Sequence, residues 1–135
     1  MSSLPIFDIA GASLNAQSVR LNSIASNLAN AESVASDPAD AYRARQPVFA
    51  AMPLADDPTL QSVRVAGVQQ SDAPAIKRYQ PGHPMADAEG YVYAPDIDPV
   101  AQMVDLISAS RGYQAGVEVL NTAKELALAT LTMGR

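Results

Sequence analysis

The sequence predicts a mainly α-helical protein in which long N- and C-terminal helices pair as an antiparallel coiled coil, with a small, irregular, β-rich segment between them. Eight of the ten prolines lie from Pro38 to Pro95, and proline disrupts helix interiors because it lacks a backbone donor. On either side of this segment, apolar residues recur at helical spacing. We therefore divide the chain into an N-terminal helix over residues 1–31, a middle segment over 32–97 and a C-terminal helix over 98–135. The two helices are expected to form one domain.

The N-terminal helix combines an apolar seam with an almost uncharged opposite face. Arg20 is the only charged residue between Gly11 and Ala31. Neighbouring chains can cover such a face without stranding charges in a dry interface. The same pattern also fits an amphipathic helix of a monomer, and periodicity alone does not decide between the two. The seam consists of Phe7, Ala10, Leu14, Leu21, Ile24, Leu28 and Ala31.

The C-terminal helix has a clear start signal. Asp98 is a favourable N-cap, and Pro99 fits the first helical position, where its missing N–H costs nothing. No proline follows, so the helix can extend for roughly 50 Å at 1.5 Å per residue. Gly112 and Gly116 lie one turn apart; we interpret them as sites of close backbone approach, with two surface glycines as the alternative. The apolar stripe of this helix consists of Met103, Leu106, Tyr113, Val117, Leu120, Ala127 and Leu131.

Short strands are expected in the middle segment. Residues 42–52 and 60–69 contain β-favouring stretches, and shorter pieces at 75–79 and 91–93 lie between proline and glycine turn formers. This segment holds 9 acidic and 5 basic residues, so it carries most of the net charge of -5.

Composition excludes several classes of partner and site. The net charge of -5 disfavours a nucleic-acid backbone or an anionic membrane as partner. The absence of cysteine excludes disulfides and cysteine-rich zinc sites. No stretch approaches the roughly 18 apolar residues of a membrane span, so we expect no direct membrane insertion. Residues 1–10 lack the pattern of a cleaved signal peptide.

The sequence contains one candidate group of catalytic residues. His83 is the only histidine, and Asp87 and Glu89 follow it closely. A monomeric acid/base hydrolase that uses His83 with Asp87 or Glu89 is therefore the competing hypothesis. No phosphate-binding loop, nucleophile turn or metal-ligand spacing accompanies these residues. We expect no catalytic residue, no cofactor and no metal site.

Three motifs resemble one protein family. Residues 14–31, with the core Ile-Ala-Ser-Asn-Leu-Ala-Asn, resemble the N-terminal motif of flagellar rod, hook and hook-associated proteins. Residues 103–135 resemble the matching C-terminal motif, and residues 83–92 resemble a segment found before the second helix. The ending at 131–135 and the longer insert at 31–43, in place of a tight Thr-Pro-Gly-Tyr turn, favour the FlgC-type proximal rod proteins within this family.

The resemblance implies a structural subunit of the flagellar basal body. It implies export by the flagellar type III apparatus without a cleaved signal peptide, and assembly in the periplasmic rod, which transmits torque and encloses an export channel. The implied partners are other copies of the chain, neighbouring rod proteins of the FlgB and FlgF type, the rod-to-ring adaptor FliE and the export apparatus.

Residues of both helices are expected to form the assembly interface. Our hypothesis packs Leu14, Leu21, Ile24 and Leu28 on Tyr113, Val117, Leu120 and Leu131, with Gly112 allowing close approach of adjacent subunits. Asn27, Asn30 and Asn121 would add directional hydrogen bonds, although exposed polar positions fit equally well. The full predicted interface consists of Leu14, Leu21, Ile24, Asn27, Leu28, Asn30, Met103, Leu106, Tyr113, Val117, Leu120 and Leu131.

Overall fold

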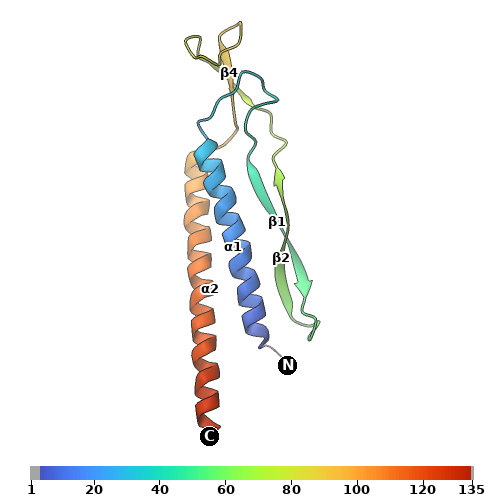
Figure 1. Cartoon of the computed structure of the whole chain (residues 1–135). Helices are drawn as coiled ribbons and strands as arrows, with labels where there is room; N and C mark the ends of the chain where they lie inside the picture. Colours follow the sequence, from blue (N-terminus) through green and yellow to red (C-terminus); the bar gives the residue numbers. More distant parts are fainter. Residues whose placement is uncertain (1–3, 135) are drawn as a thin grey trace.

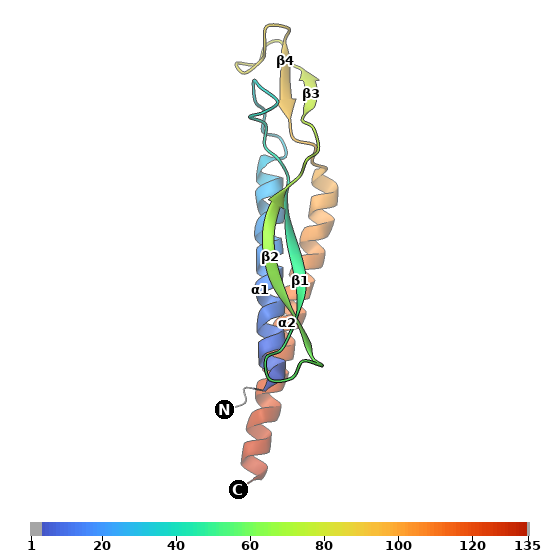
Figure 2. The same ribbon diagram turned by 90° about the vertical axis from the view of Figure 1, so that its right-hand side faces the viewer.

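The computed structural model describes residues 4–134 and shows an elongated molecule. Two long helices lie side by side, a β-hairpin runs along one of them, and a second, shorter hairpin forms a tip at one end (Figures 1 and 2). The prediction of two long helices that flank a β-containing middle segment is confirmed.

The two helices run in opposite directions. Helix α1 spans Pro5–Asn30 and helix α2 spans Pro99–Met133. The N-terminal end of α1 lies beside the C-terminal half of α2, which continues past it (Figure 1). The predicted start of α2 is confirmed: the Asp98 carboxylate accepts a hydrogen bond from the Val100 amide at 2.9 Å, and a proline occupies the first turn.

The middle segment forms two antiparallel hairpins. Strands β1 (Arg45–Pro53) and β2 (Gln61–Gln70) pair with a register shift between Val48 and Phe49, and such a bulge increases the local twist of a hairpin. Strands β3 (Ile76–Tyr79) and β4 (Tyr91–Ala94) form the tip. All four strands correspond to the predicted β segments.

The insert at residues 31–43 is attached to the tip. Ala35 and Tyr93 exchange two backbone hydrogen bonds of 2.8 and 2.9 Å. This bridge anchors the connection between α1 and β1 to strand β4. Beside it, Val92, Ala94 and Pro95 are fully buried, so the base of the tip is the most deeply buried part of the middle segment.

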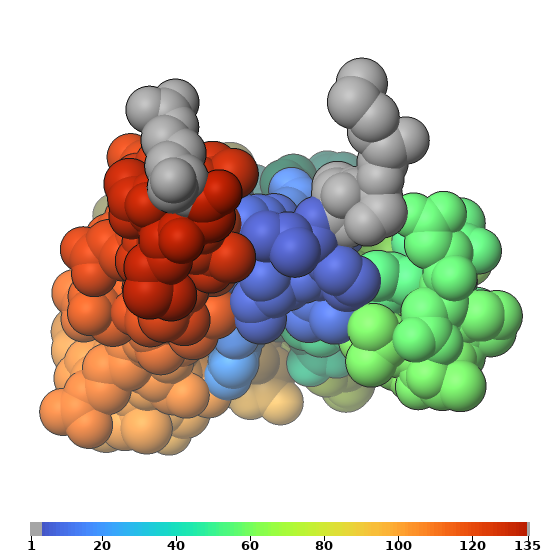
Figure 3. Space-filling model, turned by 90° about the horizontal axis from the view of Figure 1, so that it is seen from below, coloured from blue at the N-terminus to red at the C-terminus, as the bar shows by residue number. Residues whose placement is uncertain are grey.

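Helix α1 lies between α2 and the β1–β2 hairpin (Figures 1 and 3). Its buried residues are Ala10, Ala16, Ser23, Ile24 and Asn27. Most of these side chains are small, so the core is thin and the layers approach closely. Within residues 4–134, no helix is long and apolar enough to cross a membrane.

Candidate assembly interface

The contact between α1 and α2 is built on the two glycines of α2. A Cβ atom at Gly112 would lie 2.9 Å from Gln17 Nε2, and one at Gly116 would lie 2.8 Å from Leu14 Cδ2. Carbon atoms do not approach other heavy atoms this closely without displacement. The glycines therefore leave room for side chains of α1, and the close approach expected of them occurs between the two helices of one chain.

An ion pair fixes the same two helices closer to the tip. Arg20 Nη2 of α1 lies 3.6 Å from Asp105 Oδ1 of α2. Both side chains are partly exposed, and exposed pairs contribute at most about 1 kcal/mol. The pair accompanies the observed register of the helices and adds little to their stability.

Asn27 connects three elements. Its Nδ2 donates hydrogen bonds to the Arg45 carbonyl at 3.0 Å and to Gln102 Oε1 at 3.2 Å. Its Oδ1 accepts from the Arg45 amide at 2.8 Å and from the Tyr42 hydroxyl at 3.0 Å, and that hydroxyl also lies 2.8 Å from Ser26 Oγ. Asn27 is 3% exposed. Its hydrogen-bonding capacity is therefore used to join α1, the start of β1 and α2 within the chain.

Helix α2 buries very little of its apolar surface. Ala109 is the only buried residue of this helix among those that the structure describes. Monomeric soluble proteins rarely expose large contiguous apolar areas, and such areas mark interaction sites. The exposed large apolar residues of α2 are Val100, Met103, Val104, Ile107, Tyr113, Val117, Val119, Leu126, Leu128, Leu131 and Met133.

The predicted interface residues of α1 lie where the helix meets the rest of the chain. Ile24 is buried, and Leu14, Leu21 and Leu28 are half-buried. Asn30 Nδ2 donates a hydrogen bond to the Ser26 carbonyl at 2.8 Å within the same helix.

The predicted residues of α2 divide into two groups. Leu106 and Leu120 are half-buried, whereas Met103, Tyr113, Val117 and Leu131 are exposed. Leu131 is 69% exposed, so the expected packing of α1 on Leu131 is not observed, whereas packing on Tyr113 and Val117, at 39% and 37% exposed, stays a prediction. The small residues Ala109, Gly112 and Gly116 face α1 and permit a close approach of the two helices. Contact of the exposed residues with other subunits stays a prediction.

An apolar groove runs between the N-terminal part of α1 and the C-terminal half of α2. Its larger section has a volume of about 410 Å³, and an adjoining section has about 260 Å³. Sequence reasoning missed this groove, although the small residues spaced three and four apart on α2 could have indicated a hollowed face. We call it the groove; its main walls are Ile6 and Ile9 of α1 and Ala115, Val119 and Leu126 of α2.

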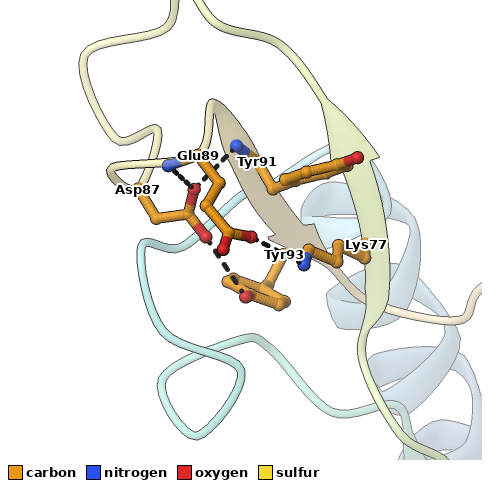
Figure 4. A network of polar contacts seen from close by, with 5 residues as sticks. All are labelled: Lys77, Asp87, Glu89, Tyr91 and Tyr93. Atoms are coloured by element: carbon orange, nitrogen blue, oxygen red, sulfur yellow. Dashed lines mark hydrogen bonds and ion pairs between the residues drawn. The ribbon is translucent and has the colours of Figure 1, made fainter.

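Asp87 and Glu89, the carboxylates that the competing hydrolase hypothesis would use, make structural contacts in the tip (Figure 4). Asp87 Oδ1 accepts hydrogen bonds from the amides of Tyr91 and Glu89, both at 2.9 Å, and Oδ2 accepts from the Tyr93 hydroxyl at 3.3 Å. The hydrogen bond from the Tyr91 amide is the main cause that lowers the pKa of Asp87. Glu89 pairs with Lys77 at 3.5 Å, and the Lys77 ammonium lies 4.1 Å from the centre of the Tyr91 ring.

His83 belongs to a neighbouring turn. Its Nδ1 accepts a hydrogen bond from the Met85 amide at 3.1 Å, and its own amide donates to the Gln80 carbonyl. These contacts hold the turn, and Asp87 is oriented by β4. Over residues 4–134, no group of three or more His, Cys, Asp or Glu side chains is arranged to hold a metal ion.

Comparison with known proteins identifies similar chains. The family model described as flagellar basal body rod FlgEFG protein C-terminal matches residues 88–133, which include β4 and the whole of α2. Flagellar basal-body rod protein FlgC of Escherichia coli O157:H7 is 53% identical over 135 residues, which is 100% of both chains. FlgC of Salmonella typhimurium (strain LT2) is also 53% identical over the full length of both chains. FlgC of Aquifex aeolicus (strain VF5) is 40% identical over 120 residues, which cover 88% of this chain and 87% of the relative.

Proposed function

This chain belongs to the FlgC family of flagellar basal-body rod proteins, and from this premise we propose how it assembles. As a member it is a structural subunit of the flagellar basal body, not an enzyme, and the hydrolase hypothesis is abandoned. We propose that its helix pair is completed by neighbouring subunits, which cover the apolar surface of α2.

The exposure of α2 is the observation that supports this proposal. A helix with apolar residues on all sides is normally buried, yet in the single chain only one face of α2 meets α1. Burial of a Leu or Val side chain contributes roughly 1.5 to 3 kcal/mol. Contacts that recur in every subunit would therefore hold a rod together without covalent links.

We assign two roles to the predicted interface residues. The half-buried leucines of α1 and the network of Asn27 set the register of the antiparallel pair inside the subunit, in the manner of a short coiled coil. The exposed stripe of α2 then packs against helices of neighbouring subunits. This stripe consists of Met103, Tyr113, Val117 and Leu131.

The partners follow from the resemblance to rod proteins. We propose contacts with other copies of the chain, with rod proteins of the FlgB and FlgF type and with the adaptor FliE. We further propose passage through the flagellar type III export apparatus and assembly in the periplasm, where the helices enclose the export channel.

A charge placed on the exposed stripe tests the proposal. Val117→Asp adds a carboxylate at a position 37% exposed in the single chain, so the subunit should fold normally. Between packed subunits the same carboxylate would cost several kcal/mol. We expect soluble periplasmic subunit and no completed rods when cells are fractionated and probed for the chain.

A matched variant controls for the added charge. Ser36→Asp places the same carboxylate in the exposed connection between α1 and β1, and we expect it to be incorporated. Normal rods built from the Val117→Asp variant would show that the stripe does not lie between subunits.

A further inference from the structure

A protruding apolar surface lies at the N-terminal end of α2. Val100, Val104 and Ile107 are 68%, 62% and 56% exposed. Their spacing of four and three residues places them on one face of the helix. Side chains with this spacing are the anchors by which a helix docks into an apolar groove. We call these three residues the ridge.

The groove defined above is a concave surface, and its lining is apolar like the ridge. Its walls are mainly aliphatic, and Gly112 and Gly116 line its adjoining section. The groove lies toward the opposite end of α2 from the ridge. Val104 and Val119 are separated by 15 residues of one continuous helix, which corresponds to about 23 Å at 1.5 Å per residue. The ridge therefore cannot enter the groove of its own chain.

We propose that the ridge of one subunit docks into the groove of a second copy of this chain. This inference rests on the proposed rod function and names the partner of the exposed surface of α2. The two helix pairs would be parallel and displaced along their axes by about 23 Å, which brings Val104 level with Val119 of the second copy. A contact between two different surfaces leaves a free ridge at one end and a free groove at the other, so it adds copies in one direction.

The proposed displacement brings charged side chains of opposite sign, which are unpaired within the chain, close to one another. Arg111 follows Ile107 by one turn and continues the ridge, and at the proposed displacement it comes level with Leu126 of the second copy, which is adjacent to Glu125. Glu118 lines the larger section of the groove. Among residues 4–134, none of Arg111, Glu118 and Glu125 forms a hydrogen bond or an ion pair within the chain. A cation on the ridge and carboxylates near the groove are complementary.

Disulfide trapping tests the contact, and the chain suits it because it contains no cysteine. Val104→Cys and Val119→Cys subunits would be co-expressed in cells that lack their own copy, and purified basal bodies would be oxidised. We expect a product of twice the subunit mass from the mixture and none from either variant alone, because the ridge meets the groove and not another ridge. A chain with both substitutions should give a ladder, since about 23 Å far exceeds the Cα separation of a disulfide, about 4.4–6.8 Å.

A control and a second pair keep the outcome decisive. Val117→Cys lies away from the groove and should not link to Val104→Cys. Val100→Cys with Ala115→Cys has the same displacement and replaces the first pair if that pair is not incorporated. Four outcomes with incorporated subunits would overturn the ridge and groove contact while the rod function stands. They are a disulfide between two Val104→Cys subunits, a disulfide between Val104→Cys and Val117→Cys, a disulfide to a protein of another mass, and no disulfide at all. Absence of the unmodified chain from basal bodies would instead overturn the proposed function.

Discussion

Replacement of Asn27 by alanine should strongly destabilise the subunit. The Asn27 amide makes four hydrogen bonds, to the amide and carbonyl of Arg45, to the Tyr42 hydroxyl and to Gln102. Each contributes about 1 kcal/mol net, and a buried group left without a partner costs about 1–3 kcal/mol. Alanine recovers about 0.7 kcal/mol at most through its higher helix propensity. We expect the free energy of unfolding to fall by about 2–4 kcal/mol.

Equilibrium urea unfolding of the purified subunit, followed by circular dichroism, measures this loss. With a urea dependence of about 2 kcal/mol per molar, the midpoint should fall by roughly 1–2 M. Asn30→Ala is the matched control, because it is the same chemical change in the same helix and removes one hydrogen bond to the Ser26 carbonyl. Equal midpoints for Asn27→Ala and Asn30→Ala would refute the role of Asn27 as the connection between α1, β1 and α2.

Three further predictions concern the helix contact and the tip. Gly116→Ala should destabilise the subunit by about 1–2 kcal/mol in the same urea assay, because the new Cβ would lie 2.8 Å from Leu14 Cδ2. This overpacking outweighs the gain in helix propensity. The double variant Gly116→Ala with Leu14→Ala should lose less stability than the sum of the two single losses. The Asp87 carboxyl should titrate below its ordinary pKa of 3.8 in an NMR titration. Its contribution to the stability of the tip is therefore present at neutral pH and is lost as the pH falls through the lowered pKa. Titration at or above 3.8 would contradict the hydrogen bond from the Tyr91 amide. His83→Ala should leave motility near normal and change stability by about 0.5 kcal/mol or less, and complete loss of motility at normal subunit levels would reopen a catalytic role.

Local signals predicted the elements of this fold. The Asp98 cap and the proline after it marked the start of α2, because both act through the first turn alone. The prolines and glycines of the middle segment bounded the strands for the same reason: each restricts the backbone at its own position. The pairing of two terminal helices followed from their shared apolar periodicity.

The face that α2 turns toward α1 did not follow from its largest side chains. The predicted seam included Tyr113 and Val117, and the structure places the neighbouring Gly112 and Gly116 against α1. Both faces have helical spacing, and the choice depends on how closely two backbones can approach. Large apolar residues of an assembly subunit can serve its neighbours, so size alone does not identify the intramolecular seam.

The hydrogen-bond network around Asn27 could also not be predicted from the sequence. Its partners Arg45 and Gln102 lie 18 and 75 residues away along the chain. A polar residue in a helix indicates a solvent-exposed position by default, and only the tertiary arrangement brings the strand and the second helix to it. The motif that contains Asn27 was recognisable, but its structural role was not.

The central claim is that neighbouring subunits cover the exposed stripe of α2, and thiol labelling tests it most directly. Single cysteines at Met103, Val117 and Leu131 would be labelled in the isolated subunit and in purified basal bodies, with Ser36→Cys reporting access of the reagent to the middle segment. We predict rapid labelling of all three positions in the isolated subunit, where they are exposed, and protection in the assembled rod. Equal labelling rates in the two states at all three positions would contradict the account.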